Sequence, residues 1–340
     1  MELSVFFAGT GGSLPSQRRG LPASLVRRGG ETLLVDCGEG TQRQLLRSIG
    51  LTDVDSILIT HLHADHWLGL PGMLKTFDLR DRGRPLPIHG PRGLRELVQG
   101  LMRYAGATSY DLHVIELEDG ELIEGDGYEI EAVAVSHRGP ALGYVLREHD
   151  RPGVFDPERA RQAGLEEGPD FGRVQRGETV AGVTPAMVMG PPRRGRKLTI
   201  SGDTRPCAAL GEAAWHSDLL IHEATFAIEE AERADQTGHS TATQAAGIAR
   251  DAEVLMLALN HISVRYPAAL LRDQAREIFA STVLPRDFDT IELPLPERGA
   301  PRLTRWSERD SAAVAHAGGS AGVEPARTQR TPAGGADSLH

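Results

Sequence analysis

The sequence predicts an α/β protein built from stacked layers of sheet and helix. Short apolar segments typical of buried strands alternate along the chain with stretches of helical spacing, which is the pattern of layered α/β folds. Five predicted strands also end in histidine or carboxylate residues. Because strand ends on one edge of such a fold converge in space, the same segments predict a cluster of polar side chains.

The bulk composition favours a soluble cytoplasmic enzyme. The chain has 340 residues, of which 40% are hydrophobic and 25% charged, enough to bury the core of one large domain or two modest ones. No apolar run reaches the roughly 18 to 20 residues of a membrane span, and the N-terminus lacks a signal-peptide pattern. Cys37 and Cys207 form no thiol metal motif, which fits a reduced compartment.

The charge balance limits the expected partners. A formal net charge of -10 argues against non-specific adhesion to nucleic acid, and we expect no binding to DNA or to a membrane. Basic patches such as residues 193–197 can still override this sum locally. Solvated surface is the alternative interpretation of such patches.

The first half of the chain predicts strands and helices in alternation. A glycine-rich tight loop at 9–12 follows the first strand, and Asp36 ends a hairpin-like pair around Gly29 and Gly30. Thr41 is a plausible cap of the first helix. Strands are expected at 1–8, 57–59, 86–89, 113–117 and 129–135. Helices are expected at 41–49 and 92–104, and a further helix begins in the central run of residues 60–72 and continues through 73–80.

A run of six residues after the strand at 57–59 concentrates metal-ligand side chains. If the chain stays extended after that strand, the side chains of His61 and His63 point to the same side, because successive side chains alternate, and both can bind one ion. Asp65 and His66 fall on the turn that opens the next helix and point to a second position. Chance clustering of surface histidines is the alternative, but four ligand-type residues at this spacing favour two metal sites.

The second half begins with a segment in which periodicity fails. Prolines and glycines repeatedly interrupt residues 148–197, and a structureless insertion of this length in a compact fold is usually functional or disordered. We interpret it as a projecting arm with a helix at 156–163. Further strands are expected at 198–200, 219–221, 254–259 and 291–295, and helices at 241–250, capped by Ser240 or Thr241, and at 267–280. Residues 307–340 should form a disordered low-complexity tail.

The ligand-type residues at the strand ends suit zinc. The set contains imidazole and carboxylate groups without sulfur, and zinc binds such groups at roughly 2.0 to 2.2 Å, although Mn²⁺ or Fe²⁺ remains open. Two ions about 3.5 to 4 Å apart can hold a shared water, lower its pKa and clamp the oxygens of a phosphoryl displacement, so hydrolysis follows. The predicted ligands are His61, His63 and His137 for one ion, Asp65, His66 and His261 for the other, and Asp203 as a bridge.

These motifs carry a family resemblance. The run His61-Leu62-His63-Ala64-Asp65-His66, with the later His137, Asp203 and His261, resembles the metallo-β-lactamase superfamily. The stretches at 7–12, 36–42, 69–72, 202–204, 222–225, 239–241 and 261–266 are similar to the ribonuclease Z family within it. The matches span about residues 1 to 270. The resemblance implies a four-layer αββα sandwich over residues 1–306, with the arm at 148–197 inserted.

The resemblance also implies an activity. It predicts a zinc-dependent endoribonuclease with two Zn²⁺ per subunit that removes the 3′ trailer from precursor tRNA, leaving a 3′-hydroxyl on the tRNA and a 5′-phosphate on the trailer. Asp65 would be both metal ligand and proton acceptor. His239 would donate a proton to the leaving 3′ oxygen and would be held by Glu223. The arm would grip the tRNA body, and the family implies a homodimer in which each arm serves the partner's site.

Two other functions remain open. A superfamily phosphodiesterase or arylsulfatase acting on small molecules would share every metal ligand but would not need the arm. A non-catalytic, metal-bound RNA-binding scaffold is the other alternative, and loss of ligands would indicate it, yet all seven are present.

Overall fold

The structure, a computed structural model, describes residues 1–307. Residues 1–305 form one compact unit that contains the strands and helices named below. The predicted disordered tail at 307–340 lies, apart from its first residue, outside the described residues. Within residues 1–307, no helix combines the length and the apolar character needed to cross a bilayer.

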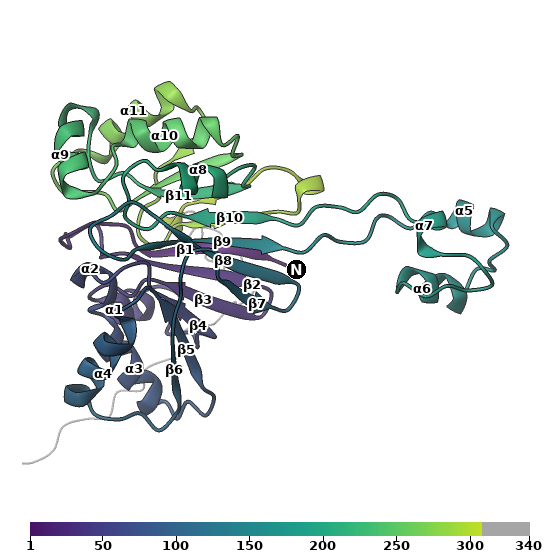
Figure 1. Ribbon diagram of the computed structural model, residues 1–340, viewed down its shortest axis with the longest axis horizontal. Helices are drawn as coiled ribbons and strands as arrows, with labels where there is room; N and C mark the ends of the chain where they lie inside the picture. Colours follow the sequence, from purple (N-terminus) through teal and green to yellow (C-terminus); the bar gives the residue numbers. More distant parts are fainter. Residues whose placement is uncertain (308–340) are drawn as a thin grey trace, which may run out of the picture. The chain divides into compact units, whose positions relative to one another are not determined.

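Two mixed sheets form the centre of the unit (Figure 1). Each sheet has an antiparallel part and a parallel part. The first sheet has the order β15(Arg302–Thr304), β14(Thr290–Glu292), β1(Leu3–Gly9), β2(Ala23–Arg28), β3(Glu31–Val35), β4(Ser56–Leu58), β5(Leu86–Gly90) and β6(Leu112–Glu116). The second has the order β13(Thr282–Val283), β12(Met256–Asn260), β11(Leu219–Glu223), β10(Lys197–Ile200), β9(Leu142–Glu148), β8(Tyr128–Ala134) and β7(Leu122–Gly125).

Helices cover the outer face of each sheet, which gives the four-layer αββα sandwich that the resemblance implied (Figure 1). Buried side chains of both sheets, among them Val5, Val26, Leu146 and Leu198, form the core between them. The first sheet carries α1(Thr41–Leu46), α2(Ala64–Trp67), α3(Leu70–Leu79) and α4(Leu94–Ala105). The second carries α8(Ala208–Ala213), α9(Ala231–Thr237), α10(Ala242–Asp251) and α11(Ala268–Ile278), with a second core rich in alanine beneath α10 and α11.

Most predicted elements are present, with differences at several boundaries. The helix expected from the central run is two helices, α2 and α3, separated by Leu68 and Gly69. At Gly69 a Cβ atom would lie 2.2 Å from the carbonyl oxygen of Gly38, so the chain bends there against neighbouring backbone. Thr41 is not the cap of α1, because its hydroxyl donates back to the Gly38 carbonyl at 2.7 Å and Gly40, at φ 83°, is the N-cap.

Other elements are not evident in the sequence pattern. The strands β7 and β9 and the helices α8 and α9 lie in segments without a clear period. Thr241, by contrast, caps α10 as one of the two residues proposed, in a capping box with Gln244.

The insertion at 148–197 is folded, so the alternative of an unstructured loop is wrong. The chain leaving β9 and the chain entering β10 run antiparallel, with bridges at Arg151–Arg193 and Phe155–Met189. They carry α5(Pro157–Gln162), α6(Pro169–Gln175) and α7(Pro185–Val188) (Figure 1). These helices share a small core of their own, and the predicted helix at 156–163 corresponds to α5, capped by Asp156.

The root of this arm is an ionic cluster. Glu148 accepts hydrogen bonds from Arg28 at 2.9 Å and from Arg196 at 2.6 and 2.7 Å, and all three side chains are buried. Glu297 accepts from Arg151 at 2.8 Å and pairs with Arg193 at 3.3 Å. The basic run that was expected to form a surface patch is therefore largely tied to carboxylates of the body.

Candidate metal centre

Seven predicted ligands and the predicted acid pair come together at one edge of the sandwich. Loops at the carboxyl ends of β4, β8, β10, β11 and β12 deliver them, so both sheets contribute. His61 and His63 follow β4, and Asp65 and His66 lie in α2. The second sheet supplies His137 after β8, Asp203 after β10, Glu223 at the end of β11, His239 after α9 and His261 after β12.

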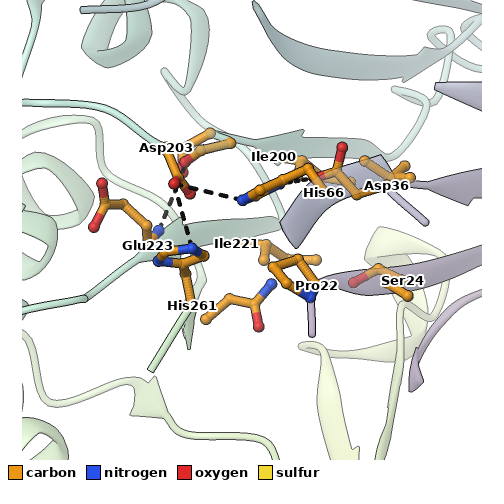
Figure 2. A pocket seen from close by; sticks show the side chains of 14 residues that line it. Pro22, Ser24, Asp36, His66, Ile200, Asp203, Ile221, Glu223 and His261 are labelled. Atoms are coloured by element: carbon orange, nitrogen blue, oxygen red, sulfur yellow. Dashed lines mark hydrogen bonds and ion pairs between the residues drawn. The ribbon is translucent and has the colours of Figure 1, made fainter. Parts of the chain in front are cut away.

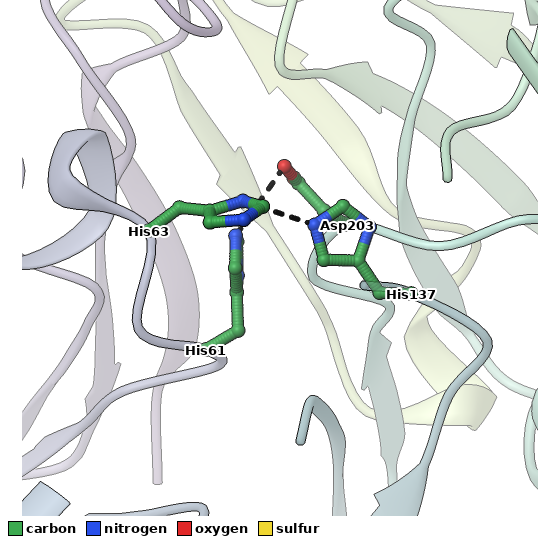
Figure 3. Close-up of side chains that lie close together, drawn as sticks. All are labelled: His61, His63, His137 and Asp203. Carbon is green, nitrogen blue, oxygen red and sulfur yellow. Dashed lines mark hydrogen bonds and ion pairs between the residues drawn. The ribbon is translucent and has the colours of Figure 1, made fainter. Parts of the chain in front are cut away.

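The donors form two adjoining groups. His61, His63, His137 and Asp203 make one (Figure 3), and Asp65, His66 and His261 make the other. The donor atoms of each group lie within 4.8 Å of one another, and a third group, Asp203, His239 and His261, overlaps both. The first two groups are the sets predicted, with Asp203 between them: its Oδ2 lies 3.6 Å from His61 Nε2, 3.5 Å from His66 Nε2 and 3.3 Å from His261 Nε2.

Those separations fit metal ligation better than hydrogen bonding. An N–H···O bond is usually about 2.7 to 3.2 Å long. Two donors, each about 2.1 Å from one tetrahedral ion, lie about 3.4 Å apart. In addition, Nε2 of His61 and Nε2 of His66 are buried without a hydrogen-bond partner, and a buried polar atom is seldom left so. The residues present therefore fit a pair of divalent cations.

Hydrogen bonds fix which ring nitrogen of the histidines can ligate. Asp36 can only accept, so Nδ1–H of His66 donates to it at 2.8 Å. The Gly238 carbonyl likewise accepts Nδ1–H of His137 at 2.6 Å. In both rings Nε2 is left as the donor atom for a metal, which is the usual outcome of a hydrogen bond to the far nitrogen of a ligating histidine.

Two threonines do the same for His61 and His261. The hydroxyl of Thr60 donates to Asp36 at 2.9 Å and so accepts from Nδ1 of His61 at 3.1 Å. The hydroxyl of Thr225 donates to Glu223 at 2.6 Å and accepts from Nδ1 of His261 at 2.8 Å. His63 differs, since its Nδ1 faces Nε2 of His137 at 3.1 Å.

The sequence analysis did not identify the groups that hold the ligating histidines through hydrogen bonds. Asp36 was noted only as a carboxylate at a strand end, and Thr225 only as part of a matching block. Their positions beside β4 and at the end of β11 are the signals that could have found them. The Gly238 carbonyl and the Ser13 amide, which donates to Asp65 at 2.8 Å, are backbone groups with no signature of their own.

The site is strongly polarised. Burial lowers the pKa of His61 and His137, which keeps these rings neutral. Burial alone would raise the pKa of Asp203, but the surrounding imidazoles, His261 and His66 foremost, outweigh burial and hold the pKa well below its usual value. An ionised, buried carboxylate among imidazoles is a binding site for positive charge.

His239 and Glu223 form a pair next to the donors. Nδ1 of His239 lies 2.9 Å from Oε1 of Glu223, and the same carboxylate accepts from the Thr204 amide at 2.9 Å. Burial would lower the pKa of His239, but the charge and hydrogen bond of Glu223 outweigh burial and raise the pKa to about 9. The ring is also 3.7 Å from Asp203, so the pair adjoins the metal donors directly.

The backbone at the site is tight. A Cβ atom on Gly12 would lie 2.4 Å from Nδ1 of His261, which explains the glycine in the first loop. Asp36 and His261 both adopt left-handed conformations, at φ 58° and 55°. Such conformations are uncommon outside glycine and gather at functional sites.

A small pocket of about 20 Å³ lies among Asp36, His66, Asp203, Glu223 and His261, between the two sheets (Figure 2). That volume holds about one water molecule and excludes a substrate. His63, by contrast, is exposed. A substrate must therefore approach the donors from the side on which His63 lies.

Comparisons with known proteins agree with this geometry. Residues 19–215 match the family model of the metallo-beta-lactamase superfamily. The chain is 43% identical over 302 residues to ribonuclease Z of Methanosarcina acetivorans and 45% identical over 304 residues to ribonuclease Z of Myxococcus xanthus, covering 86% of this chain and 98% of each relative. Human tRNase Z, short form, is 28% identical with a TM-score of 0.63, covering 86% of this chain and 99% of that one. The chain belongs to the ribonuclease Z family of the metallo-β-lactamase superfamily.

Proposed function

We propose that this protein is an endoribonuclease that hydrolyses the phosphodiester bond joining a tRNA to its 3′ trailer. The observation that carries the proposal is the shared carboxylate of Asp203 between two donor groups, with the Glu223–His239 pair beside it. Relatives named ribonuclease Z match it over nearly their whole length, which supports the substrate.

Two Zn²⁺ ions are the proposed cofactors. His61, His63 and His137 would hold one, Asp65, His66 and His261 the other, and Asp203 would contact both. When bound, such ions supply a water of lowered pKa and positive charge for the phosphate oxygens. Asp36, Thr60, Thr225 and the Gly238 carbonyl keep the ligating ring nitrogens turned inward.

Asp65 is the proposed proton acceptor. Its Oδ2 is held by the Ser13 amide at 2.8 Å and lies 3.3 Å from His261. A carboxylate fixed in this way can accept a hydrogen bond from the attacking water, orient it towards phosphorus and take its proton.

His239 is the proposed general acid. Glu223 accepts its Nδ1–H, so Nε2 is the nitrogen that can deliver a proton to the departing 3′ oxygen of the tRNA. Glu223 is itself held by the Thr204 amide and the Thr225 hydroxyl. The products are a 3′-hydroxyl on the tRNA and a 5′-phosphate on the trailer.

The folded arm supports binding of the tRNA body. Its helices have a core of their own and its root is clamped by buried and half-buried ion pairs, so it can present a defined surface. Assembly as a homodimer with arms exchanged between active sites, and residence in the cytoplasm, remain predictions from the sequence.

The test is incubation of the purified protein with a 3′-extended tRNA, with and without a chelator, followed by mapping of both new ends. We expect one cut at the tRNA 3′ end that the chelator abolishes and zinc restores. Asp65→Ala should abolish cleavage while RNA binding remains. Cleavage that persists in chelator, or unchanged turnover by the variant, would contradict the proposal.

A second experiment separates this function from a small-molecule phosphodiesterase. Deleting residues 152–196 should remove cleavage of precursor tRNA and spare hydrolysis of a chromogenic phosphodiester. If the shortened protein still cut precursor tRNA and cleaved the small diester equally well, the ribonuclease interpretation would be wrong.

A further inference from the structure

The turn that ends α9 contacts both a predicted metal ligand and the proposed general acid. The carbonyl of Gly238, the C-cap residue at φ 85°, accepts Nδ1–H of His137 at 2.6 Å. A Cβ atom on Gly238 would lie 3.0 Å from the same nitrogen, so the turn lies close against the ring. The next residue in the chain is His239. A shift of this turn would therefore move the support of one ring and the backbone of the other together.

The helix before this turn is weakly packed. α9 has seven residues, and within this helix only Ala234 is buried. Helices as short as this have little stability of their own and depend on the packing of an apolar face. Other contacts are therefore needed to fix the C-terminal turn of α9.

Two arginines supply such contacts at the carbonyl end of the helix. Nε of Arg205 donates to the Asp235 carbonyl at 2.7 Å, and Nη2 of Arg138 donates to the Gln236 carbonyl. The last carbonyls of a helix have no partner within the helix, and positive charge beside them is favourable because of the helix dipole. The two guanidinium groups are therefore well placed to hold this end of α9.

Both arginines belong to loops that deliver predicted metal ligands. Arg138 directly follows His137 after β8, and Arg205 lies two residues after Asp203, beyond β10. The two loops are joined to each other, since the Arg205 amide donates to the Ser136 carbonyl at 2.8 Å. The loops that carry the ligands thus hold the same helix end that supports one of those ligands.

Resting on the proposed function, we propose that Arg138 and Arg205 are positioning residues that fix the turn after α9. The fixed turn directs Nε2 of His137 towards its metal ion and Nε2 of His239 towards the leaving 3′ oxygen. Loss of the two arginines should then disturb a metal ligand and a proton donor at once.

The first measurement is zinc affinity, by competition with a chromogenic chelator. Arg138→Gln with Arg205→Gln, the turn variant, should bind zinc roughly tenfold more weakly, the lower end of what loss of a partner of a ligating histidine costs. The matched control, Arg233→Gln with Arg250→Gln, removes the same charge from α9 and α10, where both arginines pair with carboxylates. The control should bind zinc within about twofold of wild type.

The second measurement is turnover at saturating zinc on two substrates with different leaving groups. The 3′ oxygen of a tRNA is a poor leaving group and needs a proton, whereas nitrophenolate leaves without one. The turn variant should lose roughly tenfold in kcat on precursor tRNA at unchanged KM, and keep its kcat on bis(p-nitrophenyl) phosphate within about twofold. The control should match wild type on both substrates.

Three results would overturn the proposal. A raised KM for precursor tRNA with unchanged zinc affinity would mean that the arginines bind RNA phosphates instead. Equal losses of kcat on both substrates would mean that the turn does not position His239. Unchanged zinc affinity with unchanged kcat would mean that the turn is held without the two arginines.

The zinc measurement separates this proposal from the proposed cleavage. If the wild-type protein cut no precursor tRNA but the turn variant lost zinc affinity, cleavage would be refuted and the hold on His137 would stand. If the wild-type protein cut precursor tRNA and the turn variant bound zinc like wild type, the positioning role would be refuted and cleavage would stand. Should the double variant not fold, Arg138→Gln alone, at an exposed residue, should show the same pattern with smaller losses.

Discussion

Asp36→Asn is the sharpest test of the metal centre, because Asp36 touches no metal donor atom and acts only through its neighbours. Its Oδ2 accepts Nδ1–H of His66 at 2.8 Å, and its Oδ1 accepts the amide of Thr60 at 2.8 Å. An asparagine has a single carbonyl oxygen, so one of these two donors must face its NH₂ group. Asparagine tolerates the left-handed φ of 58° at least as well, so the backbone is not disturbed.

The expected loss follows from these contacts. Leaving one buried donor facing another costs about 1 to 3 kcal/mol, and removing such a partner of a ligating histidine typically weakens metal binding about 10- to 100-fold. The assay is zinc competition against a chromogenic chelator, with unfolding followed by circular dichroism to confirm that the variant is folded.

Asp218→Asn is the matched control. Asp218 is equally buried and accepts from Arg194 and from the Lys197 amide, at the opposite end of β11 from Glu223. Its variant should lose stability but keep zinc affinity. If Asp36→Asn bound two zinc ions within about twofold of wild type, the role given to Asp36 would be refuted.

Three further predictions concern other parts of the molecule. Gly12→Ala should weaken zinc binding, because its Cβ would lie 2.4 Å from the ring of His261. Gly30→Ala is the control, since a Cβ there has no neighbour within 4 Å and zinc affinity should not change. Equal zinc affinities of the two variants in the chelator competition would contradict this prediction. Glu148→Gln leaves Arg28 and Arg196 buried without a countercharge and should lower the free energy of unfolding in urea by about 3 to 5 kcal/mol. A change near zero would mean that these two ion pairs do not stabilise the root of the arm. Burial lowers the pKa of His89 to about 4, so the unfolded chain binds the extra proton as pH falls below about 6.5 and stability is lost towards pH 4. In metal-free protein, the free energy of unfolding should therefore fall less between pH 7 and pH 5 in His89→Gln than in wild type, by at most about 2 kcal/mol. An identical fall in both proteins would show that His89 does not contribute to the pH dependence of stability.

The structure brings the predicted ligand residues together where the residue type itself indicates metal binding. Histidine and aspartate after strands are few enough that the sequence alone assigns His61, His137 and Asp203 to a common edge. The supporting groups could not be assigned in this way, because threonine hydroxyls and backbone carbonyls occur everywhere and only tertiary placement makes the Gly238 carbonyl a partner of His137.

The fold divides in the same way. Strands with strong apolar character, such as β1 and β12, were predicted, whereas β9 was overlooked at the start of a segment rich in prolines and glycines. The folded core of the arm could not be read from periodicity, because its three helices have only four to seven residues each. The run 193–197 was predicted to be a local basic patch, and its pairing with Asp218 and Glu148 could not be foreseen because these carboxylates lie far away in sequence.

The origin of the donors in both sheets has a consequence for the whole molecule. A cation bound by both His61 and Asp203 would link the two sheets of the sandwich, because His61 follows β4 of the first sheet and Asp203 follows β10 of the second. A ligand that binds only the native chain adds about 2.7 kcal/mol at a hundredfold excess over its Kd. The melting temperature of the entire protein should then rise as the site fills with metal and fall as the metal is removed. Thermal unfolding would therefore report metal occupancy without an RNA substrate.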